Sequence, residues 1–332
     1  MTVTDTEIRD GCAAIEATFD ERPALSTIAD AIAPASRYYF LGCGSSSWVG
    51  TMAAHWFRDA GTDAEAITAS EFYFGEYAVD KETVVVAYSQ SGETTETVQA
   101  FEAAVEAGAR TVAITNTAGS ALSELADHAY VTPAGTEESI LATKSVDAAV
   151  VASILLTEAA DDGNLGSTWS AETCRSIADR DFDTAVDVFR DASHAYTLGT
   201  GIDYALAGEA ARKFGEGPLL HSTPMPAMEI SHGPMANVSG DPVLLVLSDP
   251  TMIDHYEPLL EELRDAGGRV VAIHPDTTDL AVEASIAIPV GRPQFLYTLK
   301  AIQRLTFVLA RDRGVDPDQP PALSKHVERE GL

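Results

Sequence analysis

Apolar positions along the chain follow two different periods, which together predict an alternation of strands and helices. Short runs of consecutive apolar residues, such as 84–88, are typical of buried strands, whereas apolar residues spaced three or four apart indicate helices. In the first half, strands are predicted at 37–42, 64–68, 84–88, 111–115 and 129–132. Helices are predicted at 1–33, 45–60, 94–107, 120–126 and 139–159, and later at 171–190 and 294–313. This alternation favours a parallel sheet covered by helices.

The order of segments in the first half recurs in the second half. The matching segments are 39–44 with 196–201, 84–89 with 243–248, and 107–114 with 266–273. Three matches at nearly the same offset indicate a duplicated domain. We therefore predict an α/β protein with two tandem domains, each a parallel sheet flanked by helices in three αβα layers.

The charge balance is strongly acidic and excludes some classes of partner. The net charge is −30, with 51 acidic residues against 21 lysines and arginines. Such a surface repels nucleic acid and anionic membranes, so neither partner is expected. Because the acidic residues are dispersed and only five residues are lysines, the composition favours a salt-adapted (halophilic) cytoplasm. A lysine retained in such a chain is a functional candidate, although Lys81 and Lys300 are interpreted as surface residues.

Several common features are not found in the sequence. No run approaches the roughly 20 apolar residues that cross a bilayer, and the polar N-terminus does not resemble a signal peptide. The three cysteines, Cys12, Cys43 and Cys174, are odd in number and widely spaced. They fit neither a disulfide framework nor a zinc site, which favours a reducing, cytoplasmic location. No histidine and carboxylate cluster has ligand spacing, so no metal and no cofactor are expected.

The stretch Val84–Thr94 carries the clearest chemical signal. A buried strand runs directly into a turn rich in side-chain donors (Ser89, Gln90, Ser91 and Thr94), and a helix follows. The free N–H groups and positive dipole end of that helix face the turn, which is a setting that favours phosphate. A second turn, 42–47, also places serines at a helix start. It lacks the third glycine of a dinucleotide fingerprint, so a nicotinamide cofactor is disfavoured.

Seven motifs together resemble one known family, the double sugar-isomerase (SIS) domain proteins. They are GCGSSS at 42–47, ASEF at 69–72, SQSGET at 89–94, AGTEESILATKS at 134–145, EAARKFGE at 209–216, MEISHGP at 228–234 and DQPPALSKHVE at 318–328. The chain is similar to the isomerase half of the glucosamine-6-phosphate synthases. No glutaminase domain is expected before these motifs, because Cys12 is not the N-terminal nucleophile of such a domain.

The resemblance implies a domain layout and a set of substrate contacts. The layout is 1–35 as an N-terminal helical segment, 36–165 and 191–315 as the two SIS domains, 166–190 as a connecting helix, and 316–332 as a catalytic tail. The implied phosphate and sugar contacts are Ser46, Ser89, Gln90, Ser91, Thr94, the backbone of Ile140, and Ser324. Ala142 stands where the synthases usually have a serine, which leaves the substrate open.

The resemblance also implies catalytic roles in the second half. Glu216 resembles the acid–base that moves a proton between sugar carbons 1 and 2, and Lys213 lies three residues before it on the same helical face or near the helix end. On spacing alone, these two residues would be an ordinary surface salt bridge. His232 resembles the histidine that opens the sugar ring, often across a dimer interface, although a lone histidine is more often structural.

The last catalytic candidate lies in the tail. Lys325 resembles a residue that forms a Schiff base with the ketose or holds its carbonyl oxygen, although a lysine so near a chain end is usually solvated. Lys144 lies in a family motif and is expected to support the site electrostatically.

The expected reaction is the conversion of glucosamine 6-phosphate to fructose 6-phosphate and ammonia by a homodimer. A fructosamine-6-phosphate deglycase and plain isomerisation remain as alternatives. From a different class, a sugar-phosphate sensor that binds without turnover also remains open. Such sensors usually lack the catalytic lysine and glutamate and carry a DNA-binding domain.

Overall fold

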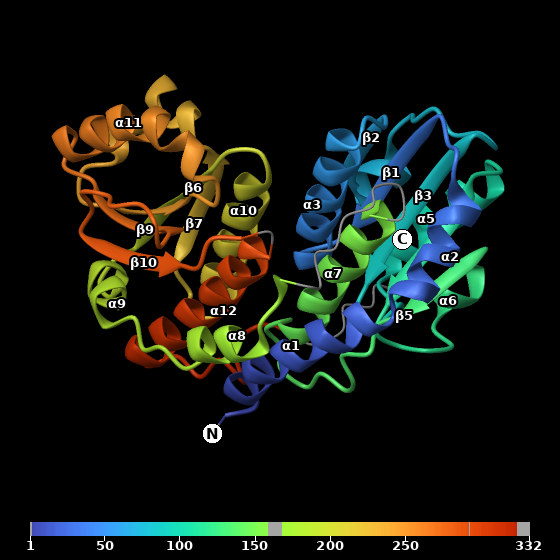
Figure 1. Ribbon diagram of the computed structural model, residues 1–332, viewed down its shortest axis with the longest axis horizontal. Coiled ribbons are helices and arrows are strands. Elements are labelled where there is room, and N and C mark those ends of the chain that lie inside the picture. The colour runs from blue at the N-terminus through green and yellow to red at the C-terminus, as the bar shows by residue number, and fades with distance from the viewer. Residues whose placement is uncertain (1, 159–167, 292, 324–332) are drawn as a thin grey trace. The chain divides into compact units, whose positions relative to one another are not determined.

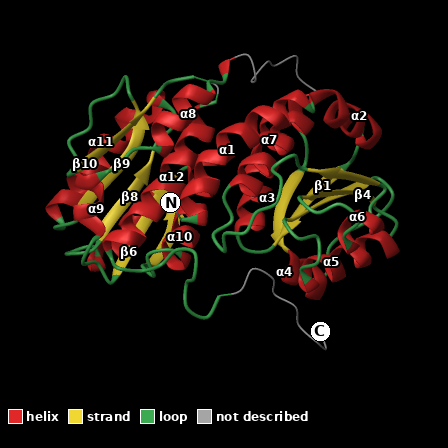
Figure 2. Ribbon diagram, turned by 90° about the horizontal axis from the view of Figure 1, so that it is seen from below, coloured by secondary structure: helices red, strands yellow, loops and turns green. Residues whose placement is uncertain are grey.

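Two five-stranded parallel sheets form the framework of the protein (Figure 1). The computed structural model describes residues 2–158, 168–291 and 293–323. The first sheet has the order β2-β1-β3-β4-β5, and the second has the equivalent order β7-β6-β8-β9-β10. Figure 2 shows that helices cover both faces of each sheet. The predicted duplication of a three-layer α/β domain is confirmed.

The first sheet lies at the centre of a compact unit formed by residues 10–138 and 142–158. Its strands are β1 (Arg37–Gly42), β2 (Ala64–Thr68), β3 (Thr83–Ser89), β4 (Arg110–Thr115) and β5 (His128–Val131). Its helices are α2 (Arg22–Ile32), α3 (Ser45–Asp59), α4 (Ala69–Phe74), α5 (Thr95–Glu106), α6 (Ala121–Leu125) and α7 (Lys144–Glu158). Every residue of β3 is buried because it is a central strand with both faces covered, which explains its continuous apolar run.

The second sheet belongs to a unit formed by residues 2–9, 139–141, 168–291 and 293–323. Its strands are β6 (His194–Gly199), β7 (His221–Pro226), β8 (Pro242–Val246), β9 (Arg269–Pro275) and β10 (Ala284–Ile288). Its helices are α8 (Ala171–Ala178), α9 (Asp183–Phe189), α10 (Ile202–Glu216), α11 (Ile253–Asp265) and α12 (Gln294–Asp312), with short 3₁₀ turns η2 (Ala227–His232), η3 (Pro234–Asn237) and η4 (Pro250–Met252). Helix α1 (Val3–Asp20) contributes its first turns to this unit.

The two repeats share a turn in which a glycine is required. Gly44, before α3, has φ 59° and ψ −130°, and Gly201, before α10, has φ 61° and ψ −124°. Residues that carry a Cβ rarely adopt such a positive φ, whereas glycine does so readily. The sheet register also corrects the sequence match, because Leu41 pairs with Ala87 whereas Leu198 pairs with Leu245. Ser248 therefore follows β8 in the place that Gln90 has after β3.

Three predicted helices differ from the observed ones. The helix expected at 1–33 is divided into α1 and α2, because Pro23 stands in the first turn of α2 and cannot continue α1. The helix expected at 171–190 is broken into α8 and α9, because Phe182 has a left-handed φ of 54° that a helix cannot continue through. The helix expected from residue 139 begins at Lys144. Its start is fixed by the Glu137 carboxylate, which accepts hydrogen bonds from the backbone N–H groups of Thr143 (2.9 Å) and Ser145 (3.1 Å).

Two further expectations are wrong. Lys300 is fully buried, and its ammonium donates to the carbonyl of Ile8 (2.8 Å) and to the side-chain oxygen of Gln303 (2.7 Å). It is a structural residue because these acceptors compensate for its burial. Cys12 and Cys174 are disulfide-bonded, whereas the thiol of Cys43 is not part of a disulfide. The expectation that the cysteines form no disulfide is therefore contradicted.

No helix among the described residues is both long enough and apolar enough to cross a membrane.

Candidate functional site

The serine turn, residues 89–94, leaves the carboxyl end of β3 and leads into α5. Ser89 is buried, and its hydroxyl accepts a hydrogen bond from the Gly92 N–H (3.0 Å) and lies 3.2 Å from the Thr94 hydroxyl oxygen. The carbonyl of Gln90 is held by the backbone N–H of Asn116 (3.1 Å). Because its backbone is fixed at both ends, the turn presents its hydroxyls and the N-terminus of α5 to the same edge of the sheet.

The second serine-containing turn, residues 42–47, leaves the neighbouring strand at the same edge. Gly42 pairs with Tyr88, so β1 and β3 end side by side. Gly42 has no room for a side chain, since an added Cβ would lie 2.7 Å from the carbonyl carbon of Ser46. Ser46 is half-buried, and within the part of the chain that the structure describes its hydroxyl has no hydrogen-bond partner. That hydroxyl is available to a ligand.

The position of both turns is the one at which ligands bind in sheets of this type. The chain runs outward from β1 to β2 on one side and from β3 to β4 and β5 on the other, so β1 and β3 flank the point where strand order reverses. Ligands of open parallel sheets bind beyond the carboxyl ends of strands at this point. The structure thus brings Ser46, Ser89, Gln90, Ser91 and Thr94 to one edge, with the N-termini of α3 and α5.

The equivalent point of the second sheet is filled by a carboxylate. Asp203, in the first turn of α10, is 5% exposed and accepts hydrogen bonds from both the backbone N–H (2.8 Å) and the hydroxyl of Ser248. Burial raises the pKa of Asp203 to about 6, although the hydrogen bonds from Ser248 oppose this change. The second repeat therefore directs its donors at a side chain of its own.

The raised pKa of Asp203 leads to a prediction about stability. Since the folded-state pKa lies above the ordinary value of 3.8, the folded protein holds this proton more tightly than the unfolded chain. The contribution of this bound proton to the stability of the folded protein is complete below about pH 4 and is lost as the pH rises to about 6. We expect Asp203→Asn to raise the free energy of unfolding near neutral pH by about 1–3 kcal/mol, because asparagine keeps the shape without the buried charge.

Denaturant unfolding at about pH 4.5 and about pH 7.5 measures this effect. The exposed Asp265→Asn is the matched control and should leave both midpoints unchanged. An Asp203→Asn protein less stable than wild type at the higher pH would contradict the prediction.

Helix α10 carries a buried cluster of two carboxylates and one ammonium. The Lys213 nitrogen lies 3.2 Å from a carboxylate oxygen of Glu209 and 3.5 Å from one of Glu216. The side chains of Lys213 and Glu209 are 1% and 0% exposed, whereas that of Glu216 is 23% exposed. The surface salt bridge that the spacing suggested is therefore wrong, because Lys213 is buried. Glu216 is the one member of the cluster whose carboxylate reaches solvent.

The cluster includes Glu209, to which the sequence assigned no role. Its signal was present in EAARKFGE, where Glu209, Lys213 and Glu216 have the spacing of one helical face. Glu216 is the last residue of α10, and Gly217 follows in a place where an added Cβ would lie 2.8 Å from a methyl group of Thr306. A small residue is needed there because the helix ends against α12.

The remaining predicted site residues belong neither to the serine turn nor to the cluster on α10. His232 ends η2 and is exposed. Lys144 is the first residue of α7, is buried, and belongs to the same unit as the serine turn. Ile140 belongs to the other unit. Ser324 and Lys325 lie outside the described residues.

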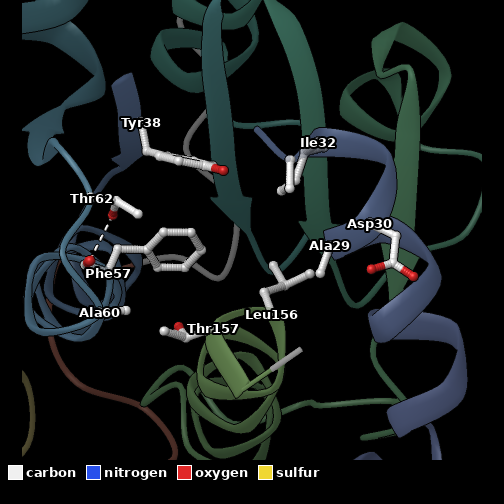
Figure 3. Close-up of a pocket in the computed structure, with 10 residues that line it drawn as sticks. Ala29, Asp30, Ile32, Tyr38, Phe57, Ala60, Thr62, Leu156 and Thr157 are labelled. Atoms are coloured by element: carbon white, nitrogen blue, oxygen red, sulfur yellow. Dashed lines mark hydrogen bonds between the residues drawn. The ribbon is translucent and has the colours of Figure 1, made fainter. Parts of the chain in front are cut away.

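A separate pocket of about 110 Å³ lies in the first unit (Figure 3). Its lining includes Ile32, Tyr38, Phe57 and Leu156. Tyr38 is near the start of β1, whereas Phe57 and Leu156 are near the ends of α3 and α7, so the pocket is at the opposite edge of the sheet from the serine turn. Its largely apolar lining does not match a phosphorylated sugar. Among the described residues, no group of three or more histidine, cysteine or acidic side chains could hold a metal ion.

Comparison with known families and proteins gives consistent results. The model of the SIS domain matches residues 31–159 and 188–309. The glutamine–fructose-6-phosphate aminotransferase (isomerizing) of Pyrobaculum aerophilum is 32% identical over 319 residues, which cover 91% of this chain and 53% of that protein. The Pseudomonas putida protein of the same name is 31% identical over 322 residues, 90% of this chain and 52% of that protein. The chain thus spans about half the length of the curated relatives it matches.

Solved structures share the fold over nearly their whole length. The C-terminal domain of glucosamine-fructose-6-phosphate aminotransferase from Francisella tularensis superposes with a TM-score of 0.84 at 22% identity, covering 96% of this chain and 98% of that chain. Glucosamine-6-phosphate deaminase from Thermotoga maritima gives a TM-score of 0.80 at 24% identity, covering 98% and 99%.

Proposed function

The chain belongs to the SIS domain family, and on this basis we propose that it is a phosphosugar isomerase that converts glucosamine 6-phosphate to fructose 6-phosphate and ammonia. Its similarity to an isomerizing fructose-6-phosphate aminotransferase and to a glucosamine-6-phosphate deaminase supports an enzyme with a sugar-phosphate substrate. The amino sugar is proposed from the names of the relatives, which are an isomerizing fructose-6-phosphate aminotransferase and a glucosamine-6-phosphate deaminase.

The observation that carries the proposal is the carboxylate of Glu216. It ends α10 with partial access to solvent and lies 3.5 Å from a buried ammonium. An acid–base group needs access to the substrate, and a neighbouring ammonium can stabilise its ionised carboxylate. In the proposed role, Glu216 removes the proton from carbon 2 of the open-chain amino sugar and delivers it to carbon 1, while Lys213 balances the two carboxylates of the cluster.

The proposed phosphate site is the serine turn together with Ser46. Hydroxyls and backbone N–H groups at the N-termini of α3 and α5 supply donors without adding a full positive charge. In this role, Ser89, Gln90, Ser91 and Thr94 bind phosphate and sugar, Ile140 and Ser324 add further contacts, and Lys144 supplies positive charge.

Two further groups complete the proposed mechanism. His232, which is exposed, assists opening of the sugar ring, and in the proposed homodimer it serves the partner's site. After the proton transfer, the nitrogen is bonded to carbon 2 as an imine, which water hydrolyses to the ketone and ammonia. Lys325 polarises carbon 2 or takes the place of ammonia on it as a Schiff base.

Ammonia release from glucosamine 6-phosphate by the wild-type protein, assayed at high salt, tests this function directly. Release in step with fructose 6-phosphate formation is the expected result. If none is found, the deaminase assignment fails, and fructosamine 6-phosphates are the next substrates. Binding of fructose 6-phosphate without turnover of any of these compounds would make the protein a sensor.

A further inference from the structure

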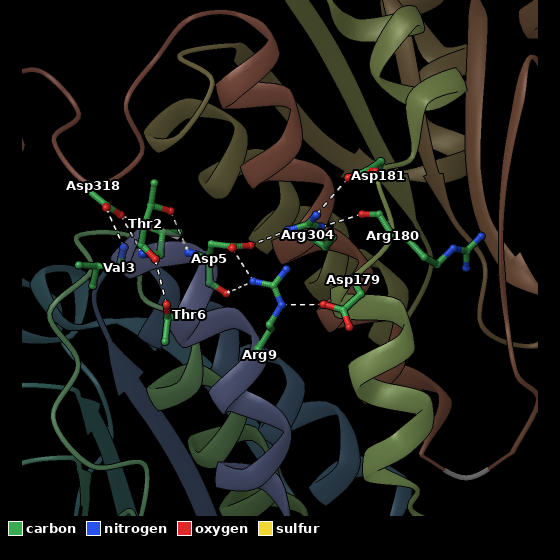
Figure 4. A network of polar contacts seen from close by, with 11 residues as sticks. Thr2, Val3, Asp5, Thr6, Arg9, Asp179, Arg180, Asp181, Arg304 and Asp318 are labelled. Carbon is green, nitrogen blue, oxygen red and sulfur yellow. Dashed lines mark hydrogen bonds and ion pairs between the residues drawn. The ribbon is translucent and has the colours of Figure 1, made fainter.

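The N-terminus of α1 is capped by a residue from the far end of the chain. The carboxylate of Asp318 accepts a hydrogen bond from the backbone N–H group of Val3 at 2.8 Å (Figure 4). It also accepts hydrogen bonds from the backbone N–H group of Thr4 at 2.8 Å and from the Thr4 hydroxyl at 2.6 Å. Burial acts to raise the pKa of Asp318, but the hydrogen bonds from Thr4 and Val3 outweigh it and keep the pKa below its usual value. A charged acceptor at a helix N-terminus is favourable, so this cap is a strong one.

The same threonine also reaches a second distant segment. The hydroxyl oxygens of Thr4 and Ser139 are 2.7 Å apart, and the Ser139 backbone N–H donates to the Glu7 carboxylate at 3.0 Å. Thr4, Glu7 and Ser139 are 0%, 4% and 1% exposed. Ser139 directly precedes Ile140, and Asp318 begins the DQPPALSKHVE motif that contains Lys325. One buried hydroxyl therefore contacts two of the segments that supply residues of the proposed site, the one that carries Ile140 and the one that leads to Lys325.

The first turns of α1 are themselves anchored by charged groups. Arg304, on α12, donates to the Asp5 carboxylate at 2.7 Å and to the backbone carbonyl of Arg180 at 2.7 Å (Figure 4). Arg9 donates to Asp179 at 2.6 Å. Arg304 is 4% exposed, so loss of its partners would leave a buried charge, and the arrangement resists displacement. Thr4 therefore lies in a helical turn whose position is fixed by these ion pairs.

We propose that Thr4 and Asp318 are positioning residues, which fix the start of the C-terminal tail and the segment carrying Ile140 relative to one another. The proposal rests on the function proposed above for Ile140 and Lys325. An ordinary helix cap would need only the bonds to Asp318. The additional contact of Thr4 with Ser139 links the two segments, so removing one hydroxyl should disturb both.

Thr4→Val tests the proposal because it removes the hydroxyl and preserves the side-chain volume, whereas Thr4→Ser keeps the hydroxyl. The matched control is Thr251→Val, since the N–H and hydroxyl of Thr251 donate to Asp249 at 2.8 and 2.7 Å in the same arrangement. We expect kcat of Thr4→Val to fall about 10- to 100-fold with KM changed less than about threefold, because small displacements of reacting groups are costly. Thr4→Ser and Thr251→Val should retain kcat within about twofold.

Amide hydrogen exchange in peptides containing Ser139 gives a second measurement that needs no turnover. Exchange should be faster in Thr4→Val than in wild type, Thr4→Ser or Thr251→Val. Unchanged exchange would overturn the link between the segments, and faster exchange with unchanged kcat would overturn its role in positioning. If the wild type releases no ammonia, the proposed reaction fails, but exchange still decides whether Thr4 links the two segments. Asp318→Asn, which weakens the cap and keeps the contact with Ser139, should give a smaller change in both measurements.

Discussion

Replacing Glu216 with glutamine is expected to lower kcat for ammonia release by about 10²–10⁴, which is the usual contribution of a general acid–base. Glutamine has the shape of glutamate but cannot take up the proton from carbon 2. KM should change little, because the phosphate is proposed to bind at the serine turn in the other repeat. Steady-state kinetics with glucosamine 6-phosphate measures both parameters.

The exposed Glu172→Gln on α8 serves as the control, since it removes the same charge from the same half of the protein. It should leave kcat within about twofold of wild type. A Glu216→Gln protein that kept kcat within about threefold would contradict the acid–base role.

Replacing Lys213 with methionine is expected to lower the free energy of unfolding by about 3–5 kcal/mol, as found when one partner of a buried ion pair is removed. Methionine fills most of the volume of the lysine side chain but has no charge. The carboxylate of Glu209, which is 0% exposed, would then lose its buried ammonium at 3.2 Å. Denaturant unfolding monitored in the second repeat measures the loss.

Two variants distinguish this electrostatic cause from a general sensitivity of the fold. Adding Glu209→Gln to Lys213→Met should recover much of the lost stability, because it removes the buried charge that has lost its ammonium. Lys81→Met, at an exposed position, should change stability by less than about 0.5 kcal/mol. A loss below about 1 kcal/mol in Lys213→Met would contradict the buried-cluster account.

Most of the fold could be predicted because its signals are local. The strand at 84–88 is apolar throughout since β3 is covered on both faces, and the turn glycines recur because both repeats need the same positive φ at Gly44 and Gly201. The break between α8 and α9 was missed because Phe182 has no sequence signal for its left-handed backbone. The late start of α7 was missed because its cap, Glu137, is a side chain from outside the helix.

The site was predicted less completely because burial depends on distant packing. Lys300 and Lys213 are both lysines in amphipathic helices, and the sequence does not distinguish either from a surface residue. Both are buried where acceptors from the same unit surround them. Likewise, the pairing of Asp203 with Ser248 joins residues of two different segments, so spacing along the chain could not reveal it.

The central claim is that the first repeat binds the phosphate and the second performs the proton transfer. The most direct test compares kcat and KM for ammonia release in wild type, Ser46→Ala and Glu216→Gln. We predict that Ser46→Ala raises KM about tenfold or more with kcat nearly unchanged, since it removes one hydrogen bond to a charged group. Glu216→Gln should lower kcat and leave KM nearly unchanged. Equal losses of kcat in both variants, or a Glu216→Gln variant that changes only KM, would contradict this division between the repeats.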